Sequence, residues 1–262
     1  MSGFQSMKIF HGILLASCLA AAASAWGEGE IIDAARAALD AAAIPVEAKA
    51  SIRSKIDAKS GDFSALLAES LAERKADPML FFRVDKAQAL PAGYVPADLV
   101  GLDGKGLSVS RAGHRLRAAA FRALKAMDAA ARAEGVALLV SSSYRSYEYQ
   151  VEVWNRGVKA EGETATAAVI AKPGHSQHQL GEAIDFGSIT DAFAQTKASR
   201  WLAANARRFG FSLSFPKGMT QVTGYDWESW HYRYIGIAAA ALEERYFGGL
   251  QQYLMLFLEE LR

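Results

Sequence analysis

The stretch PGHSQHQLGEAIDF, residues 173–186, places two histidines, two carboxylates and two glycines in fourteen positions. Its end, EAIDF, is typical of a short apolar strand, where the carboxylate of Asp185 would be costly to bury without a partner. His178 lies seven residues earlier, a separation that puts the two side chains on opposite faces of an uninterrupted strand. Convergence therefore requires a bend, and Gly181 lies between them to permit one. We expect His178 and Asp185 to hold a common partner.

The segment YDWESWHYRY, residues 225–234, supplies another histidine. Its last residues alternate as in a strand, so the aromatic side chains share one face and His231 takes the other. With His178 and Asp185, His231 gives the three protein ligands of a catalytic zinc site, which keeps its fourth position open for water. Glu228, three residues before His231, is placed to act as the general base and then as the general acid.

Arg145 follows the apolar stretch VALLVSS, residues 136–142, which is typical of a buried strand. Its guanidinium keeps its charge and offers a rigid fork of donors. Such a group can stabilise the oxygen that becomes negative when a carbonyl is attacked. We expect Arg145 to be a transition-state stabiliser; the alternative is a structural ion pair with Asp185.

Helical and strand patterns are interleaved over the rest of the chain. Residues 31–77 have the periodicity of helices, with breaks at Pro45 and at a turn beginning at Gly61. Residues 79–106 contain short β-rich runs, and residues 111–134 form a strongly periodic helix. Short strands linked by turns favour an α+β fold, a small antiparallel sheet flanked by helices and carrying the zinc site, with an N-terminal helical appendage.

We predict four parts along the chain: a signal peptide at 1–25, a helical N-terminal appendage at 26–78, a catalytic domain at 79–247 and a C-terminal helix at 248–262. The predicted signal has a lysine, an apolar run and a small-residue cleavage site, Ala-Ser-Ala.

The sequence LASC resembles a lipoprotein box, so a lipoprotein signal that ends before a lipidated Cys18 is the alternative. Lipidation would tether the protein to a membrane. Either way we expect an exported protein of the periplasm or cell envelope.

Composition excludes several function classes. The chain has 29 basic and 28 acidic side chains, whereas nucleic-acid binding needs a concentrated positive field, so we expect no nucleic-acid partner. Cys18 is the only cysteine, which excludes an intrachain disulfide and a cysteine-based metal cluster. His114 lies among arginines in a predicted helix, and we expect it on a solvated surface.

Taken together, the motifs resemble the zinc D-alanyl-D-alanine carboxypeptidases of the VanY type, a group related to the D,D-dipeptidases and the hedgehog zinc domain. The resemblance extends from about Met79 to Gly236 and rests on several ordered motifs. These include SSYRSYEYQ, PGHSQHQLGEAIDF as the family's S-x-H-x-x-G-x-A-x-D, and TGYDWESWHYRYIG as its E-x-W-H segment.

The resemblance implies Zn²⁺ as the cofactor, with His178, Asp185 and His231 as ligands. It gives Glu228 and Arg145 the catalytic roles. It also implies that Gln150 and Ser176 line the substrate-binding cleft. Ser229 stands where many relatives carry proline.

The function that this resemblance implies is hydrolysis of the terminal D-alanine from peptidoglycan stem peptides by a metallopeptidase. The same ligands would serve an L,D-carboxypeptidase, a D,D-dipeptidase or an endopeptidase on the same substrate class. A non-catalytic, zinc-containing wall-binding module is the alternative from another class. The motifs do not determine the oligomeric state.

Overall fold

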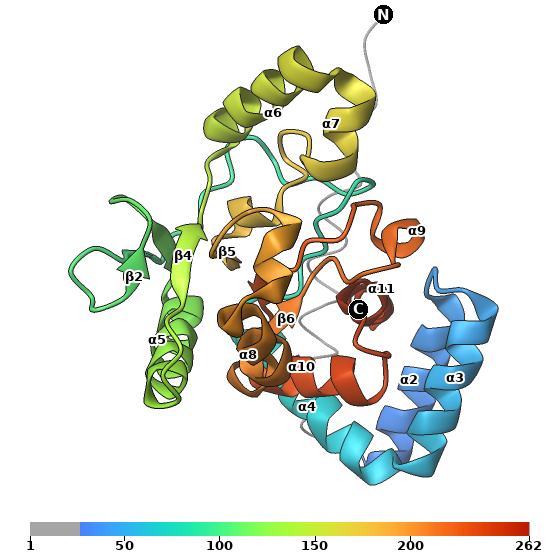
Figure 1. Ribbon diagram of the computed structural model, residues 1–262. Helices are drawn as coiled ribbons and strands as arrows, with labels where there is room; N and C mark the ends of the chain where they lie inside the picture. The colour runs from blue at the N-terminus through green and yellow to red at the C-terminus, as the bar shows by residue number, and fades with distance from the viewer. Residues whose placement is uncertain (1–26, 262) are drawn as a thin grey trace, which may run out of the picture.

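A five-stranded sheet forms the centre of the computed structural model, which describes residues 27–261 (Figure 1). The strand order is β2-β4-β5-β7-β6; β2 and β4 run parallel, and the other neighbours are antiparallel. A separate two-stranded ribbon pairs β1 with β3. The expected α+β fold is confirmed. The strands are β1 (Leu99–Gly101), β2 (Ser108–Val109), β3 (Arg115–Arg117), β4 (Leu139–Ser142), β5 (Ala183–Phe186), β6 (Phe211–Leu213) and β7 (His231–Tyr234).

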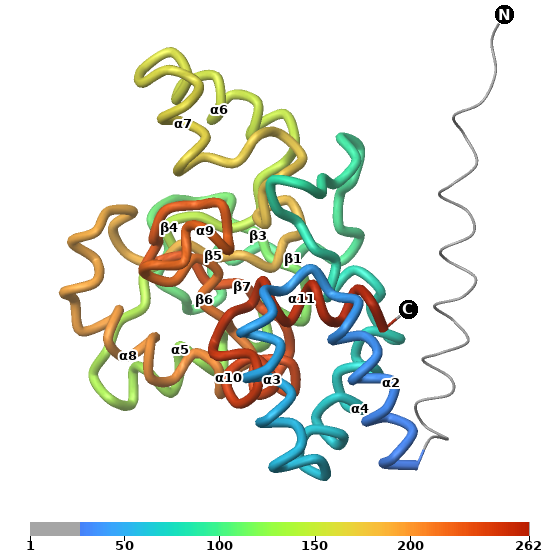
Figure 2. The backbone as a smooth tube through the Cα atoms, turned by 90° about the vertical axis from the view of Figure 1, so that its right-hand side faces the viewer, coloured from blue at the N-terminus to red at the C-terminus, as the bar shows by residue number. Residues whose placement is uncertain are grey.

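Helices α5 and α8 cover one face of the sheet. Apolar residues of α5 such as Leu124 and Met127 are fully buried in a cluster with Phe186 of β5 and Tyr232 of β7. Helices α6 and α7 stand apart from this core, at the end of the molecule away from α10 (Figure 2). The helices on this part of the chain are α5 (Ala118–Ala133), α6 (Tyr147–Glu161), α7 (Glu163–Val169), α8 (Lys197–Asn205) and α9 (Thr220–Thr223), with 3₁₀ turns η1 (Gln177–Leu180), η2 (Asp191–Gln195) and η3 (Ala206–Phe209).

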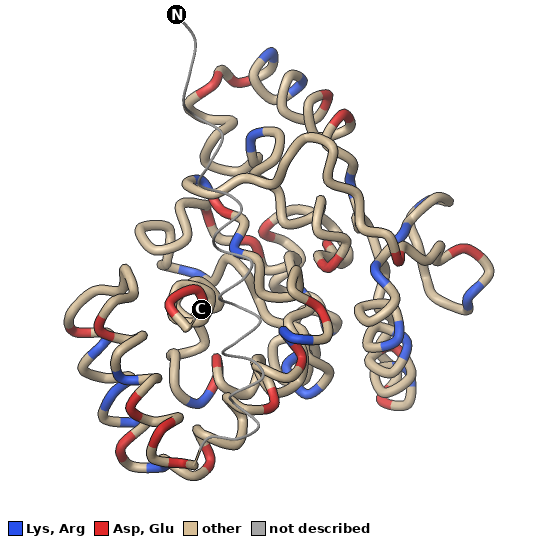
Figure 3. The backbone as a smooth tube through the Cα atoms, turned by 180° about the vertical axis from the view of Figure 1, so that it is seen from behind, with Lys and Arg blue, Asp and Glu red and all other residues tan. Residues whose placement is uncertain are grey.

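The N-terminal helices pack against the two last helices of the chain (Figure 2). Phe63 of α4 is fully buried there, with its ring centroid 5.0 Å from that of Tyr246 and 6.2 Å from that of Phe257. Basic and acidic residues are interspersed along these helices (Figure 3). The elements are α2 (Glu28–Ala41), α3 (Val46–Ala58), α4 (Ser60–Ala76), α10 (Ile237–Arg245) and α11 (Gln251–Glu260).

Three local predictions differ from the structure. The break in the N-terminal helices falls at Lys59, and Gly61 lies in the first turn of α4. Helix α5 begins at Ala118, because residues 115–117 are held extended as β3 against β1. Residues 79–86 form no strand; the carbonyls of Leu80 and Phe82 accept hydrogen bonds from the buried guanidinium of Arg233 instead of from a neighbouring strand.

The predicted signal peptide and Cys18 lie outside the described residues. Between residues 27 and 261, none of the helices combines the length and apolar character that crossing a membrane requires.

We predict that the N-terminal helices unfold together with the rest of the chain. Phe63→Ala removes a ring from a core shared by α4, α10 and α11, so it should lower the free energy of unfolding by about 3–5 kcal/mol. Denaturant unfolding followed by circular dichroism should keep a single transition at a lower midpoint.

The control is Val46→Ala, at an apolar residue that is 76% exposed. It should change the free energy of unfolding by about 0.5 kcal/mol or less. Two separate transitions in Phe63→Ala, one of them at the wild-type midpoint, would show that the helices are an independent unit.

Candidate active site

Strand register brings Asp185 and His231 together. The antiparallel pairing of β5 with β7 places Asp185 directly opposite His231. Side chains opposite each other in such a pair lie close enough to interact. His231 Nδ1 is 3.0 Å from Asp185 Oδ1, and both residues are buried. The register of β5 with β7 therefore brings two of the predicted ligands together.

His178 reaches the same point from η1. The Ser176 side chain caps this turn by accepting a hydrogen bond from the His178 amide at 3.3 Å. Gly181 ends η1 at a φ of 74°, and a Cβ there would lie 3.0 Å from side-chain atoms of Arg117 and Leu99. Glycine is suited to both constraints, and the expected bend is confirmed. His178 Nε2 lies 3.2 Å from Asp185 Oδ2.

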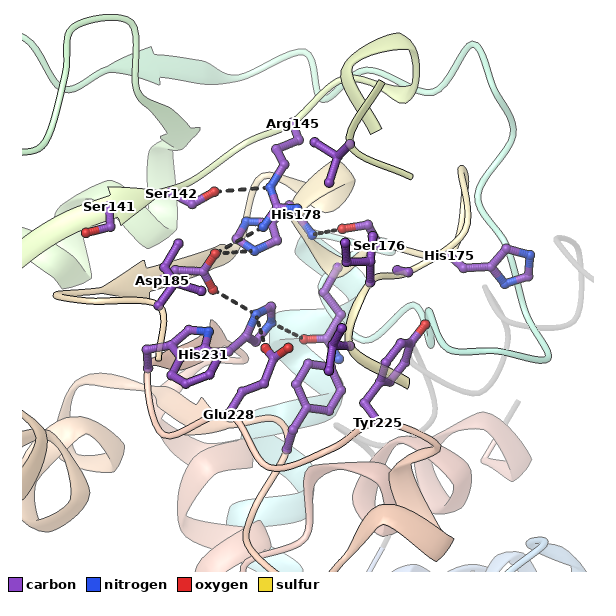
Figure 4. Close-up of a pocket in the computed structure, with 18 of the residues that line it drawn as sticks. Ser141, Ser142, Arg145, His175, Ser176, His178, Asp185, Tyr225, Glu228 and His231 are labelled. Atoms are coloured by element: carbon purple, nitrogen blue, oxygen red, sulfur yellow. Dashed lines mark hydrogen bonds and ion pairs between the residues drawn. The ribbon is translucent and has the colours of Figure 1, made fainter. Parts of the chain in front are cut away.

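The three side chains fit a metal ion. One ligand atom from each of His178, Asp185 and His231 lies within 4.8 Å of the other two (Figure 4). His178 Nε2 and Asp185 Oδ1 are buried and have no hydrogen bond. Even so, His178 Nε2 lies 3.2 Å from Asp185 Oδ2, and Asp185 Oδ1 lies 3.0 Å from His231 Nδ1. Ligand atoms of a tetrahedral zinc site, with bonds of about 2.0–2.1 Å, lie about 3.3 Å apart. Two imidazoles and a carboxylate are a donor set that zinc binds, and their separations are close to this value.

Hydrogen bonds behind the ligands fix how each imidazole is used. His178 Nδ1 donates to the carbonyl oxygen of Ser143 at 2.8 Å, and His231 Nε2 donates to Gln177 Oε1 at 3.2 Å. The other ring nitrogen of each histidine faces Asp185. Such contacts set the tautomer and orientation of metal-binding histidines.

The Gln177 side chain belongs to a buried polar network that the sequence did not reveal. Its Oε1 accepts a hydrogen bond from Ser214 Oγ at 2.7 Å, and its Nε2 donates to Gln251 Oε1 at 3.2 Å. Gln251 is the first residue of α11. The C-terminal helix therefore supports the orientation of His231 through Gln177.

His114 is another residue whose position differs from the prediction. It is 2% exposed instead of solvated, and its Nδ1 lies 3.0 Å from the Ser143 hydroxyl. Since the Ser143 carbonyl accepts from His178, this contact supports the other histidine.

Glu228 lies beside the three candidate ligands. Its Oε2 is 3.4 Å from His231 Nδ1, and its amide donates to the Phe215 carbonyl at 3.0 Å. Burial, with the negative charge of Asp185, raises the pKa of Glu228 well above its ordinary value. A carboxyl with a raised pKa holds a proton more readily than one in water, which suits a group that takes up and releases a proton.

The pKa values of two candidate ligands, His178 and Asp185, are lowered instead. Burial, with the charge of Arg145, lowers the pKa of His178 to about 4, so its imidazole is neutral at neutral pH. Burial opposes ionisation of Asp185, but its polar contacts, among them the hydrogen bond from Arg145 Nη2, hold the pKa of that carboxyl well below its usual range. Neutral imidazoles and an ionised carboxylate are the protonation states that bind metal.

Arg145 is held by three hydrogen bonds. Its Nε donates to Ser142 Oγ at 3.1 Å, Nη1 to Gln150 Oε1 at 3.2 Å and Nη2 to Asp185 Oδ2 at 3.0 Å. The structural ion pair with Asp185 is therefore present. A guanidinium has five N–H donors, so two remain for a ligand. Arg145 lines the cavity, and the ion pair is compatible with the predicted catalytic role.

The two residues expected to bind substrate differ in position. Ser176 lines the cavity of about 350 Å³ that contains the candidate ligands. Gln150 is 1% exposed, is not among the residues lining this cavity, and donates to the Ala171 carbonyl at 2.7 Å while accepting from Arg145. Its contacts hold Arg145 in place, and a substrate contact of Gln150 stays a prediction.

Comparison with known proteins gives the family. The family model described as VanY, D-alanyl-D-alanine carboxypeptidase, matches residues 113–237. The structure of the LdcB LD-carboxypeptidase is similar, with 34% identity and a TM-score of 0.61 over 68% of this chain and 85% of LdcB. A mutant of the vancomycin resistance D,D-pentapeptidase VanY, solved in complex with Zn(II), gives 33% identity and a TM-score of 0.55 over 70% of this chain and 98% of VanY. The chain belongs to the VanY family of D-alanyl-D-alanine carboxypeptidases.

The similarity to curated relatives covers only part of each chain. YodJ of Bacillus subtilis (strain 168) is 38% identical over 164 residues, which are 60% of this chain and 60% of YodJ. The chain spans 38% to 60% of the curated relatives that it matches. The family match covers neither the N-terminal helices nor α11, the helix that carries Gln251.

We predict that Gln177 positions His231 for metal binding. Gln177→Met keeps the length of the side chain but removes the acceptor for His231 Nε2, so zinc affinity should fall about 10-fold to 100-fold. Competition with a chromophoric chelator measures this affinity. Gln221→Met, at an exposed position of α9, is the control. Wild-type zinc affinity in a folded Gln177→Met protein would limit Gln177 to a packing role.

Proposed function

We propose that this protein is a zinc metallopeptidase that removes the terminal D-alanine from peptidoglycan stem peptides. The observation that carries the proposal is the position of Glu228, a partly buried carboxyl 3.4 Å from His231 in the cavity that also holds His178 and Asp185. A purely structural metal site needs no such group. Membership of the VanY family supports the substrate class.

The ligands of the ion in this proposal are His178, Asp185 and His231. When bound, zinc supplies a Lewis acid that makes a water molecule more acidic and polarises the scissile carbonyl. Glu228 takes the proton from the attacking water and returns it to the departing amine. Arg145 directs its remaining N–H donors to the carbonyl oxygen as negative charge develops there. Asp185 keeps the Arg145 fork in position through the 3.0 Å contact.

We also propose that the protein acts outside the cytoplasm, in the periplasm or cell envelope, because its proposed substrate lies there. The basic, apolar and small-residue pattern of residues 1–25 supports export. A membrane tether through lipidated Cys18 is the alternative to cleavage after Ala25.

We predict that Glu228→Gln abolishes hydrolysis and retains zinc. The amide cannot accept a proton, so turnover should fall about 100-fold or more, while the three ligands are unchanged. Mass spectrometry of purified pentapeptide and tetrapeptide muropeptides, with and without a chelator, measures turnover and metal dependence, and elemental analysis measures bound zinc. Glu161→Gln, on the exposed side of α6, is the control.

The products also distinguish the alternatives. Loss of D-alanine from pentapeptides only indicates D,D-carboxypeptidase activity, whereas loss from tetrapeptides indicates L,D-carboxypeptidase activity, which is the activity named for LdcB. Release of a dipeptide or cleavage of a cross-link indicates the other two activities. Full turnover in Glu228→Gln would remove this residue from the mechanism. Muropeptide binding without turnover in the zinc-loaded wild type would favour the wall-binding module.

We predict that Arg145→Lys lowers kcat more than it raises KM. Lysine keeps the positive charge but cannot maintain three fixed hydrogen bonds and still direct donors at the substrate. The loss of transition-state stabilisation should lower kcat about 100-fold to 1,000-fold. Steady-state kinetics on the best muropeptide measure it, and Arg156→Lys, an exposed residue of α6, is the control. An increase in KM alone would indicate that Arg145 only binds substrate.

A further inference from the structure

A second cavity adjoins the catalytic one. It has a volume of about 250 Å³, and its walls include Lys86, Trp154, Lys172, His175 and Tyr225. His175 and Tyr225 also line the catalytic cavity, so the two cavities are neighbouring parts of one cleft. In Figure 4, these two residues lie on the opposite side of the candidate ligands from Ser141 and Ser142. The cleft therefore continues in one direction from the reaction centre.

The charged side chains that line the second cavity are two lysines. No carboxylate is among the residues that line it in the described part of the chain. Lys86 Nζ lies 4.6 Å from the centroid of the Tyr225 ring, and within residues 27–261 it has no ion-pair partner. Lys172 Nζ lies 5.5 Å from the centroid of the Trp154 ring and 3.0 Å from Glu163 Oε1. The pair of Lys172 with Glu163 is exposed, and exposed ion pairs are weak, so Lys172 can contact an anionic ligand instead.

The nearby acidic residue, Asp85, has partners of its own. The Asp85 carboxylate accepts hydrogen bonds from Arg83, from Gln252 at 2.7 Å and from the Ala87 amide at 2.8 Å. Its backbone carbonyl accepts from His175 Nδ1 at 2.7 Å, which fixes the imidazole at the border between the two cavities. Within residues 27–261, Asp85 forms no ion pair with Lys86 or Lys172, so both ammonium groups are available to a ligand.

We propose that this second cavity is a subsite for a carboxylate that the stem peptide carries upstream of the scissile bond. The inference rests on the proposed function and extends it to substrate choice. The leaving D-alanine has only a methyl side chain, so a further 250 Å³ is more space than that residue needs and suits a longer upstream group. Lys86 and Lys172 attract a carboxylate, which a lysine side chain lacks. The faces of Trp154 and Tyr225 pack against the apolar stem of the same group.

Stem peptides offer two carboxylates of this chemistry. One is the side-chain carboxylate of diaminopimelate at the third position, which lysine-type stems lack. The other is the α-carboxylate of the γ-linked D-glutamate, which amidation removes. Both belong to the same chemical class, and peptides that lack one or the other distinguish them.

The test compares the zinc-loaded wild type with Lys86→Gln and Lys172→Gln. The substrates are synthetic pentapeptides with diaminopimelate, with amidated diaminopimelate or with lysine, each made with D-glutamate or with D-isoglutamine. Each substitution should raise KM about threefold to tenfold for peptides that keep the recognised carboxylate, with kcat unchanged. Peptides that lack it should show the same KM in the variants and in the wild type.

Lys217→Gln is the matched control. Lys217 Nζ lies 5.0 Å from the centroid of the Trp227 ring, in the same type of cation–π contact, but it lines neither cavity. It should bind every peptide as the wild type does. Glu163→Gln, which releases Lys172 from its ion pair, should leave the KM of acidic peptides unchanged or lower it.

Calorimetric binding of the corresponding tripeptides, which lack both D-alanines, separates the two proposals. If the wild type hydrolyses no stem peptide but binds acidic tripeptides more tightly than amidated ones in a manner dependent on Lys86, the subsite stands and the carboxypeptidase proposal fails. If Lys86→Gln and Lys172→Gln bind all tripeptides with wild-type affinity, the subsite is overturned. An equal loss of affinity for every peptide also overturns it, because the lysines would then bind the terminal carboxylate that all of them share.

Discussion

The structure depends on the burial of one carboxylate between two strands. Asp185 is 2% exposed in the middle of the sheet, where an unpartnered charge would be very unfavourable. Arg145, His178 and His231 direct polar nitrogens at it from the end of β4, from η1 and from β7. Because these segments are far apart in the chain, the folded sheet is required to assemble the site. Asp185 Oδ1 and His178 Nε2 have no hydrogen-bond partner, so both atoms are available to bind a cation.

Support for the site extends beyond the segment that matches the family. From His231, hydrogen bonds run through Gln177 to Gln251 of α11. Helix α11 packs against α2 and α10, and α10 packs against α4 (Figure 1). The N-terminal helices thus contribute to the rigid surroundings of the ligands through a shared apolar core, at some distance from the chemistry. Rigid support of this kind matters because metal bonds and proton transfers tolerate little displacement.

Local charge differs from the net charge of the molecule. With 29 basic and 28 acidic side chains, the whole chain is almost neutral, and basic and acidic residues are interspersed along the backbone (Figure 3). Within the cleft the charges are unevenly placed. Asp185 and Glu228 line the larger cavity together with Arg111 and Arg145, whereas the charged side chains lining the adjoining cavity are Lys86 and Lys172. A cleft organised in this way can combine an acid–base step with recognition of an anionic group, although the overall charge indicates neither.

The sequence alone determined the fold class, the bend at Gly181 and the set of residues that meet at the site, because strand alternation, turn chemistry and ordered motifs are local properties. It could not locate the break at Lys59, the ribbon at residues 115–117 or the burial of His114, since each depends on contacts with segments distant in the chain. For the same reason only the tertiary structure decided that Gln150 holds Arg145 and that Gln177 holds His231. A buried polar group takes whichever partner the fold brings within hydrogen-bond distance, and spacing along the chain does not specify that partner.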